Sequence, residues 1–449
     1  MRSSIPVTPR RDRVVIAIVL AAALATVAGL ATVWWWVSQG PGLGPRNPAV
    51  QLVPVQTGLA WPIALAFASD GRVFYAERNT GAIRIIENGA VLPTPFFTLP
   101  NTATAGERGL LGLALDPGFP ATPWVYAYQT YNDAANASTY NRIVRIQASG
   151  NAGVSSSVIF PMPALSGATN HNGGVIAFGP DGRLWAVVGE NANPSLAQTG
   201  MSPLGKVLRM DSDGNPAPDN PFYGSMSWEN HVYTYGHRNM FGLAFHPVTG
   251  RAYVTENGPN CNDEVNLLTA GSNYGWGPSW TCTIPPSPAS TNRDGPSPVM
   301  PIDWWGAPTI APTNAAFFTG PLLPQSRNHL MFGAYNDHRL RELTLTSDGT
   351  AVVNETVLLT ATEAILDVEM GRDGYLWVTT PTTIYRLEAV PTIVPYAGGL
   401  GTSAIVTPSD WLAALLLGPA MLVVPESRPI WILAQVLEPR RDTEPRAFT

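Results

Sequence analysis

The sequence predicts an all-β fold of the β-propeller type, with a transmembrane helix before it and an apolar tail after it. Short apolar runs recur in pairs around Asp-Gly or Thr-Gly turns, which are typical of β-hairpins. No long amphipathic helix separates these hairpins over residues 51–390, as expected for radial β architecture. An irregular β-sandwich with chance turns is the alternative, and the hairpin spacing does not fix the number of blades.

The predicted membrane anchor lies at the N-terminus. Residues 1–13 carry four arginines, and residues 14–37 are an uncharged run that ends in three tryptophans. Such a run is long enough to cross the roughly 30 Å hydrocarbon core as a helix. The arginines on its N-terminal side place residues 38 onward outside the cytoplasm. A cleaved signal peptide is the alternative, but its apolar region usually has only about 7–15 residues. We therefore expect a single-pass cell-membrane protein with an extracytoplasmic domain.

A linker and the propeller follow the anchor. Residues 38–50 are rich in Gly and Pro and predict a linker, and residues 51–390 predict the propeller. The recurring hairpin units are found at residues 63–76, 111–128, 175–187, 243–254 and 365–378.

The C-terminal segment, residues 391–449, has a different composition. Two apolar stretches, 411–424 and 430–436, are separated by charged residues, and neither is long enough to span a bilayer. Either an interfacial segment beside the anchor or a loosely packed tail over the propeller fits this pattern.

The net charge limits the kinds of partner that the protein can bind, and the compartment determines the state of its two cysteines. The net charge is −6, and no basic run follows the N-terminus, which argues against a nucleic-acid partner. Lys206 is the only lysine among 26 basic residues. Cys261 and Cys282 are too few for a disulfide scaffold or a zinc cluster. In an oxidising compartment we expect them to pair.

Two polar clusters stand directly before predicted strands. Asn170 and His171 precede two glycines, an arrangement in which an imidazole can act as a neutral base beside a close ligand. Arg238 and Asn239 form the second cluster, where the guanidinium offers a planar fork of donors. A buried structural histidine and a surface ion pair are the alternatives for these two clusters.

A third cluster, residues 256–264, concentrates carboxylate, amide and backbone oxygens in a Gly/Pro loop, and Asn273-Tyr274-Gly275-Trp276 follows. Oxygen ligands of this kind suit a hard cation such as Ca²⁺. A loop rich in Asx turns is the alternative.

Taken in order, the motifs resemble those of the glucose/sorbosone dehydrogenase family, whose members include quinoprotein aldose sugar dehydrogenases. The resemblance spans about residues 55–385 and implies six blades. The matching motifs are Gly106-Glu-Arg-Gly-Leu-Leu-Gly, Asn170-His-Asn-Gly-Gly, Gly205-Lys-Val-Leu-Arg, Gly236-His-Arg-Asn, Glu256-Asn-Gly-Pro-Asn, Asp263-Glu and Asn273-Tyr-Gly-Trp.

The resemblance implies a role for each of several residues. His171 falls on the catalytic base, which would take the C1 hydroxyl proton of an aldose while hydride passes to pyrroloquinoline quinone (PQQ). The residues on cofactor-contacting positions are Glu107, Asn170, Arg238 and Asn239. The residues on calcium positions are Gly258, Pro259, Glu264 and Tyr274. The implied partners are a sugar, Ca²⁺ and an extracytoplasmic electron acceptor.

Three departures from the family pattern concern charge. Glu107 stands where a glutamine is usual, and Asn336 lies in the segment that aligns with a late-blade lysine. Ala364 and Leu366 replace two arginines that grip the quinone carboxylates. These losses predict weak quinone binding and leave two other functions open: a catalytically silent propeller that binds a carbohydrate or protein, and a metal-dependent lactonase.

Overall fold

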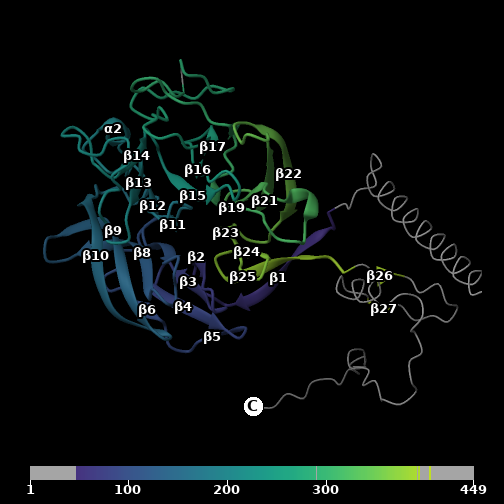
Figure 1. Cartoon of the computed structure of the whole chain (residues 1–449). Coiled ribbons are helices and arrows are strands. Elements are labelled where there is room, and N and C mark those ends of the chain that lie inside the picture. The colour runs from purple at the N-terminus through teal and green to yellow at the C-terminus, as the bar shows by residue number, and fades with distance from the viewer. Residues whose placement is uncertain (1–46, 290, 392, 395–403, 406–449) are drawn as a thin grey trace, which may run out of the picture. The chain divides into compact units, whose positions relative to one another are not determined.

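The computed structural model describes residues 47–289, 291–391, 393–394 and 404–405 of the chain (Figure 1). The predicted anchor at 14–37 and most of the predicted tail lie outside these residues. Within the described part, no helix is long and apolar enough to cross a membrane. Residues 391–449 form a separate unit in which β26 (Ile393–Val394) pairs with β27 (Ala404–Ile405).

Six antiparallel sheets form the blades of a propeller, as the sequence and its family resemblance predicted (Figure 1). Blade 1 contains β2 (Pro62–Phe67), β3 (Val73–Glu77), β4 (Ala82–Glu87), β5 (Ala90–Val91) and β6 (Phe97–Thr98). Blade 2 contains β7 (Leu110–Leu115), β8 (Trp124–Asp133), β9 (Ser138–Ser149) and β10 (Ala152–Ala164). Blade 3 contains β11 (Ile176–Phe178), β12 (Leu184–Val188), β13 (Lys206–Met210) and β14 (Val232–Tyr235).

The other three blades repeat this order of strands. Blade 4 contains β15 (Met240–Phe245), β16 (Ala252–Glu256), β17 (Asp263–Leu267) and β18 (Asp303–Trp305). Blade 5 contains β19 (Pro312–Phe317), β20 (Leu330–Ala334), β21 (Arg339–Leu345) and β22 (Val352–Thr360). Blade 6 contains β23 (Asp367–Met370), β24 (Leu376–Thr379), β25 (Thr383–Ala389) and β1 (Val50–Thr57). Two short helices, α2 (Pro194–Gln198) and η1 (Pro324–Ser326), lie in connections.

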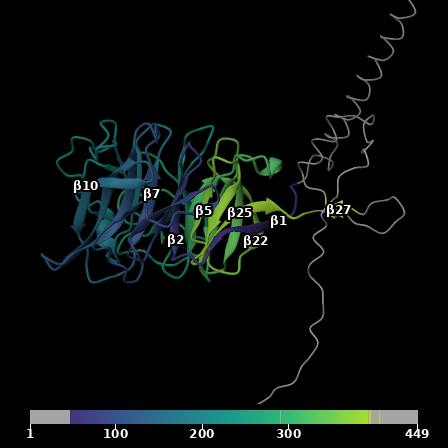
Figure 2. The same ribbon diagram turned by 90° about the horizontal axis from the view of Figure 1, so that it is seen from below.

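The first strand closes the ring. β1 is the outer strand of blade 6 and runs antiparallel to β25, with Val50 opposite Ala389 and Thr57 opposite Thr383. The two strands lie side by side in both views (Figure 1; Figure 2). The last blade is thus completed by the first described strand, which joins the two ends of the domain.

The predicted hairpin turns follow one design in blades 3 and 6. Gly182 and Gly374 adopt the left-handed conformation, with φ of +72° and +83°. The aspartate before each glycine accepts a hydrogen bond from a tryptophan indole of the next strand: Asp181 from Trp185 at 3.3 Å and Asp373 from Trp377 at 3.1 Å. The Asp-Gly-x-x-Trp sequence therefore fixes both the turn and the start of the second strand.

The core lies between the blades. Six buried apolar clusters occur in the described chain, one at each contact between neighbouring blades. Aliphatic and aromatic side chains dominate them; Phe74, for example, makes edge contacts with Phe96 and Phe119. This packing holds the first strand of each blade in place. These strands are β2, β7, β11, β15, β19 and β23.

Candidate functional site

His171 enters β11 in a left-handed conformation, with φ of +57°. Its backbone N donates to Glu107 Oε2 at 2.7 Å, and its ring Nδ1 lies 2.7 Å from Glu190 Oε2. Glu190 follows β12 and is fully buried. A carboxylate at Nδ1 favours the tautomer that carries its proton there, which leaves Nε2 as an acceptor. Within the described chain, Nε2 has no hydrogen-bond partner, so its lone pair can accept a proton.

Glu107 links three blades beside this histidine. Its Oε2 accepts hydrogen bonds from His171 N and from Asn239 Nδ2, the latter at 3.1 Å. Asn239 in turn accepts a hydrogen bond from Gly173 N at 3.2 Å. Glu107, His171 and Asn239 enter β7, β11 and β15 respectively, and their hydrogen bonds fix the three entries relative to one another.

A small pocket contains all four residues predicted for calcium. It has a volume of about 20 Å³, enough for one ion or water. The lining residues are Arg238, Glu256, Asn257, Gly258, Pro259, Asn262, Glu264, Tyr274, Trp276, Trp280 and Asn292.

The chemistry of this pocket fits a hard cation. Burial, and then the nearby Glu256, raise the pKa of Glu264 well above its usual range. The side-chain oxygens of Asn257 and Asn262 in the pocket wall are buried and accept no hydrogen bond from the described residues. The part of the chain that the structure describes has no group of three His, Cys, Asp or Glu placed for a metal. A cation here would therefore be bound mainly by amide and backbone oxygens, which is typical of Ca²⁺.

Arg238 and Trp276 connect the pocket to the histidine. The Arg238 guanidinium donates to the carbonyl oxygens of Asn257 at 2.7 Å and Gly258 at 3.1 Å. It also lies 5.4 Å from the centre of the Trp276 ring. Trp276 donates its indole N–H to Glu190 Oε1 at 3.3 Å. Burial lowers the pKa of Arg238, although the surrounding carboxylates oppose that shift.

Both ring nitrogens of His237, the residue before Arg238, are engaged by neighbouring side chains. Its Nδ1 lies 2.8 Å from Glu256 Oε2 and its Nε2 lies 3.0 Å from the Thr234 hydroxyl. The ring stacks on Tyr274 at 4.5 Å. The Tyr274 hydroxyl donates to the Leu267 carbonyl oxygen at 2.6 Å. Since that hydroxyl is engaged, the oxygen that Tyr274 can offer a cation is its backbone carbonyl, which also accepts a hydrogen bond from Asn292 Nδ2 at 2.5 Å and has a second lone pair.

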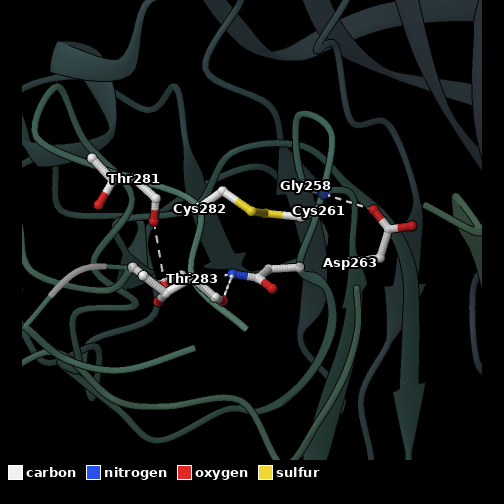
Figure 3. Close-up of a disulfide and its surroundings, with 8 residues drawn as sticks. Gly258, Cys261, Asp263, Thr281, Cys282 and Thr283 are labelled. Carbon is white, nitrogen blue, oxygen red and sulfur yellow. Dashed lines mark hydrogen bonds between the residues drawn. A yellow bond between two sulfur atoms is a disulfide. The ribbon is translucent and has the colours of Figure 1, made fainter. Parts of the chain in front are cut away.

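A disulfide and an aspartate hold the loop that forms the pocket (Figure 3). Cys261 and Cys282 are bonded, which confirms the predicted pairing. Asp263 accepts hydrogen bonds from Gly258 N at 2.8 Å and from Ala311 N at 2.7 Å. The carboxylate thereby attaches the loop of blade 4 to the entry of blade 5, and burial raises its pKa.

A larger cavity, of about 360 Å³, adjoins Glu107 and Asn257. Residues from all six blades line it, and most are apolar or uncharged. The lining comprises Trp61, Ile63, Arg78, Gly106, Glu107, Leu111, Gly173, Val175, Phe241, Asn257, Ala311, Thr313, Asn314, Tyr335, Asn336 and Leu366. Asn257 also lines the small pocket, so the two spaces are neighbours. His171 lines neither of them, but its N–H donates to Glu107 in the cavity wall, and its partner Glu190 accepts a hydrogen bond from Trp276 in the pocket wall.

Of the four positions noted for their charge in the sequence, three line this cavity and one does not. Leu366 and Asn336 line it, whereas Ala364 is buried outside the lining. Arg341 cannot substitute for the missing cations, because it pairs with Asp337 and Glu355. Lys206 is also remote, since its buried Nζ donates to three backbone carbonyls around α2.

The structure brings most of the predicted site residues together. His171, Glu107 and Asn239 share one network, and Arg238, Gly258, Pro259, Glu264 and Tyr274 share the pocket. Asn170 lines neither space. Sequence reasoning missed Glu190 and Arg78. For Glu190 the available signal was its place at the end of a buried strand, in Val188-Gly189-Glu190-Asn191.

Comparison with known proteins agrees with this architecture. The family model described as "Glucose / Sorbosone dehydrogenase" matches residues 59–386. Aldose sugar dehydrogenase YliI of Escherichia coli is 30% identical over 339 residues, covering 74% of this chain and 90% of that protein. The PQQ-bound aldose sugar dehydrogenase structure from Streptomyces coelicolor is 30% identical, with a TM-score of 0.63 over 77% of this chain and 99% of that one. The apo soluble aldose sugar dehydrogenase of Escherichia coli is 27% identical, with a TM-score of 0.68 over 76% of this chain and 100% of that one. The chain therefore belongs to the glucose/sorbosone dehydrogenase family.

Proposed function

We propose that the protein is a dehydrogenase that oxidises an aldose at C1 to the lactone, with His171 as the base. The observation that carries this proposal is the His171–Glu190 pair, which leaves Nε2 without a hydrogen-bond partner among the described residues, while His171 N donates to Glu107 in the cavity wall. Membership of a family of sugar dehydrogenases supports the reaction class.

The chain supplies the proton chemistry. The C1 hydroxyl would transfer its proton to His171 Nε2, and Glu190 would stabilise the imidazolium that forms. A positioned base of this kind contributes roughly 10²–10⁴-fold in rate. The hydride from C1 must pass to an organic oxidant, and a quinone is the class that the PQQ-bound relative suggests.

We further propose that the small pocket binds Ca²⁺. Glu264, the Gly258 and Tyr274 carbonyls and the amide oxygens of Asn257 and Asn262 would hold it. Such an ion would offset the charge of Glu256 and Glu264 and act as a Lewis acid beside the cavity. The protein's own part is to fix these oxygens through Arg238, Asp263 and the disulfide.

The cavity fits PQQ poorly. PQQ carries three carboxylates, but among the described residues that line the cavity Arg78 is the only cation. Each missing charge-assisted hydrogen bond costs about 1.5–3 kcal/mol. We therefore expect PQQ to bind weakly, and we propose the redox partner only as an organic quinone.

We also propose that the protein is tethered to the cell membrane by residues 14–37, with the propeller outside the cytoplasm. The disulfide supports an oxidising compartment. Its electron acceptor would then be extracytoplasmic. Carbonate extraction of membranes tests the tether: the full chain should stay in the pellet, and release into the supernatant, or a mature N-terminus beyond residue 38, would exclude it.

A silent propeller that binds a carbohydrate or protein is the second candidate, and the missing cations are the observation that favours it. A lactonase that uses the metal pocket is the third candidate.

Product analysis separates the three candidate functions. The full chain, with saturating PQQ and millimolar Ca²⁺, should convert an aldose to its lactone while reducing a dye. Hydrolysis of added lactone without dye reduction would identify the lactonase, and neither activity would indicate the binding propeller.

A further inference from the structure

Arg78 brings a free cationic group to the cavity. It follows β3, and its Nε donates to the Arg108 carbonyl oxygen at 3.2 Å. The guanidinium lies 4.9 Å from the centre of the Trp61 ring. Neither Nη atom has a hydrogen-bond or ion-pair partner among the described residues. The planar pair of Nη donors is thus free to bind a carboxylate in the cavity.

The rest of the wall offers a different kind of contact. Glu107 uses Oε2 for His171 and Asn239, so its Oε1 can accept a hydrogen bond from a ligand hydroxyl. The Thr313 hydroxyl is buried and unpaired among the described residues. Leu366 and Phe241 present apolar surface instead of further cations. A second or third carboxylate would have no cationic partner in the described lining and would also face Glu107.

We propose that Arg78 anchors a single carboxylate, and that the cavity is built for a hydroxylated ligand with one negative charge at that position. The carboxylate belongs either to a sugar-acid substrate or to one end of the quinone cofactor. If the carboxylate belongs to a substrate, the inference rests on the proposed function. For either source of the carboxylate, the inference concerns binding to Arg78, and binding can be measured without turnover.

The test is calorimetric titration of the full chain in detergent. D-glucuronate, D-glucose and PQQ are the probes, because glucuronate differs from glucose by a carboxylate at C6. Arg78→Gln removes the cation. Arg372→Gln is the matched control, since Arg372 also donates its Nε to one carbonyl but lies in the β23–β24 turn. Arg78→Lys keeps the charge without the planar fork.

We expect Arg78→Gln to weaken binding of at least one anion about tenfold or more, with Arg78→Lys intermediate and Arg372→Gln unchanged. An effect on glucuronate assigns the carboxylate to the substrate, and an effect on PQQ assigns it to the cofactor. If neither anion depends on Arg78, the inference is wrong. If Arg78→Gln does not fold, Arg78→Lys is the test, and affinities for both anions equal to those of wild type would show that the planar pair of Nη donors does not bind a carboxylate. Arg78-dependent binding without any dye reduction would contradict the proposed function alone.

Discussion

At the scale of single residues, the site depends on side chains at the entry to each inner strand. Trp61, Glu107, His171, Arg238 and Leu366 occupy that place in five of the six blades. Trp61, Glu107 and Leu366 line the cavity, and Arg238 lines the small pocket, so a change of one of them changes the wall of one of these spaces. This explains how a family fold can keep its base and its oxygen-rich loop while the charge of the cavity changes.

Leu366→Arg tests whether lost cations limit quinone binding. Leu366 lines the cavity, so an arginine there should tighten PQQ binding by about tenfold or more, as expected for one charge-assisted contact. Ala364→Arg is the comparison, because Ala364 is buried outside the lining and should give no gain. Fluorescence titration with PQQ measures both. If Leu366→Arg and wild type bind PQQ with equal affinity, the missing positive charge at position 366 does not limit PQQ binding.

At the scale of elements, the loop between β16 and β17 and the segment after β17 form the cation pocket together. Three connections hold them: the disulfide, the Asp263 hydrogen bonds, and the Asn262 side-chain N–H that donates to the Thr283 carbonyl at 3.1 Å. The loop has little regular structure of its own, so its shape depends on these connections.

Opening the disulfide should therefore weaken calcium binding. The Cys261→Ser, Cys282→Ser double variant loses a cross-link that closes a loop of about 20 residues, worth roughly 3 kcal/mol in the loop-entropy model. We expect a lower Tm and a smaller rise in Tm on adding Ca²⁺, measured by scanning calorimetry. A calcium-induced rise equal to that of wild type would show that the disulfide does not shape the pocket. Chelation should remove the rise in both proteins.

The sequence predicted the elements better than their long-range contacts. Asp-Gly turns and apolar alternation predict hairpins because those signals are local, and the hairpin at 175–187 is present as β11 and β12. The partner of His171 was not predictable, because Glu190 is brought to it by the pairing of two strands and the turn after β12. The sequence did not predict the contacts of Lys206 either, whose Nζ donates to the carbonyls of Leu196, Ala197 and Leu204.

At the scale of the whole molecule, the ring is stabilised by the six interfaces between blades and closed by β1. Pairing of β1 with β25 joins segments more than 300 residues apart in the sequence, with Val50 opposite Ala389. No local pattern in β1 reports this partner.

Deleting residues 50–57 should destabilise the propeller. The deletion removes the outer strand of blade 6 and leaves the β25 edge without its hydrogen bonds. Each lost kcal/mol lowers the Tm of a large domain by about 2–4 °C, so a fall of many degrees is expected. Removal of residues 391–449 is the comparison and should lower the Tm less, because it leaves the strands of all six blades in place. A larger fall in Tm after removal of residues 391–449 than after deletion of residues 50–57 would contradict this description of the ring closure.

The most direct test of the account is aldose-dependent dye reduction by wild type and His171→Gln, with saturating PQQ and millimolar Ca²⁺. The account predicts that wild type reduces the dye and that His171→Gln is slower by about 10²–10⁴-fold. His171→Gln should keep the rise in Tm that Ca²⁺ causes. His246→Gln, which changes a histidine in the β15–β16 turn, should retain wild-type activity. Wild-type activity in His171→Gln, or no dye reduction by wild type, would contradict the assignment of this propeller as a sugar dehydrogenase with His171 as its base.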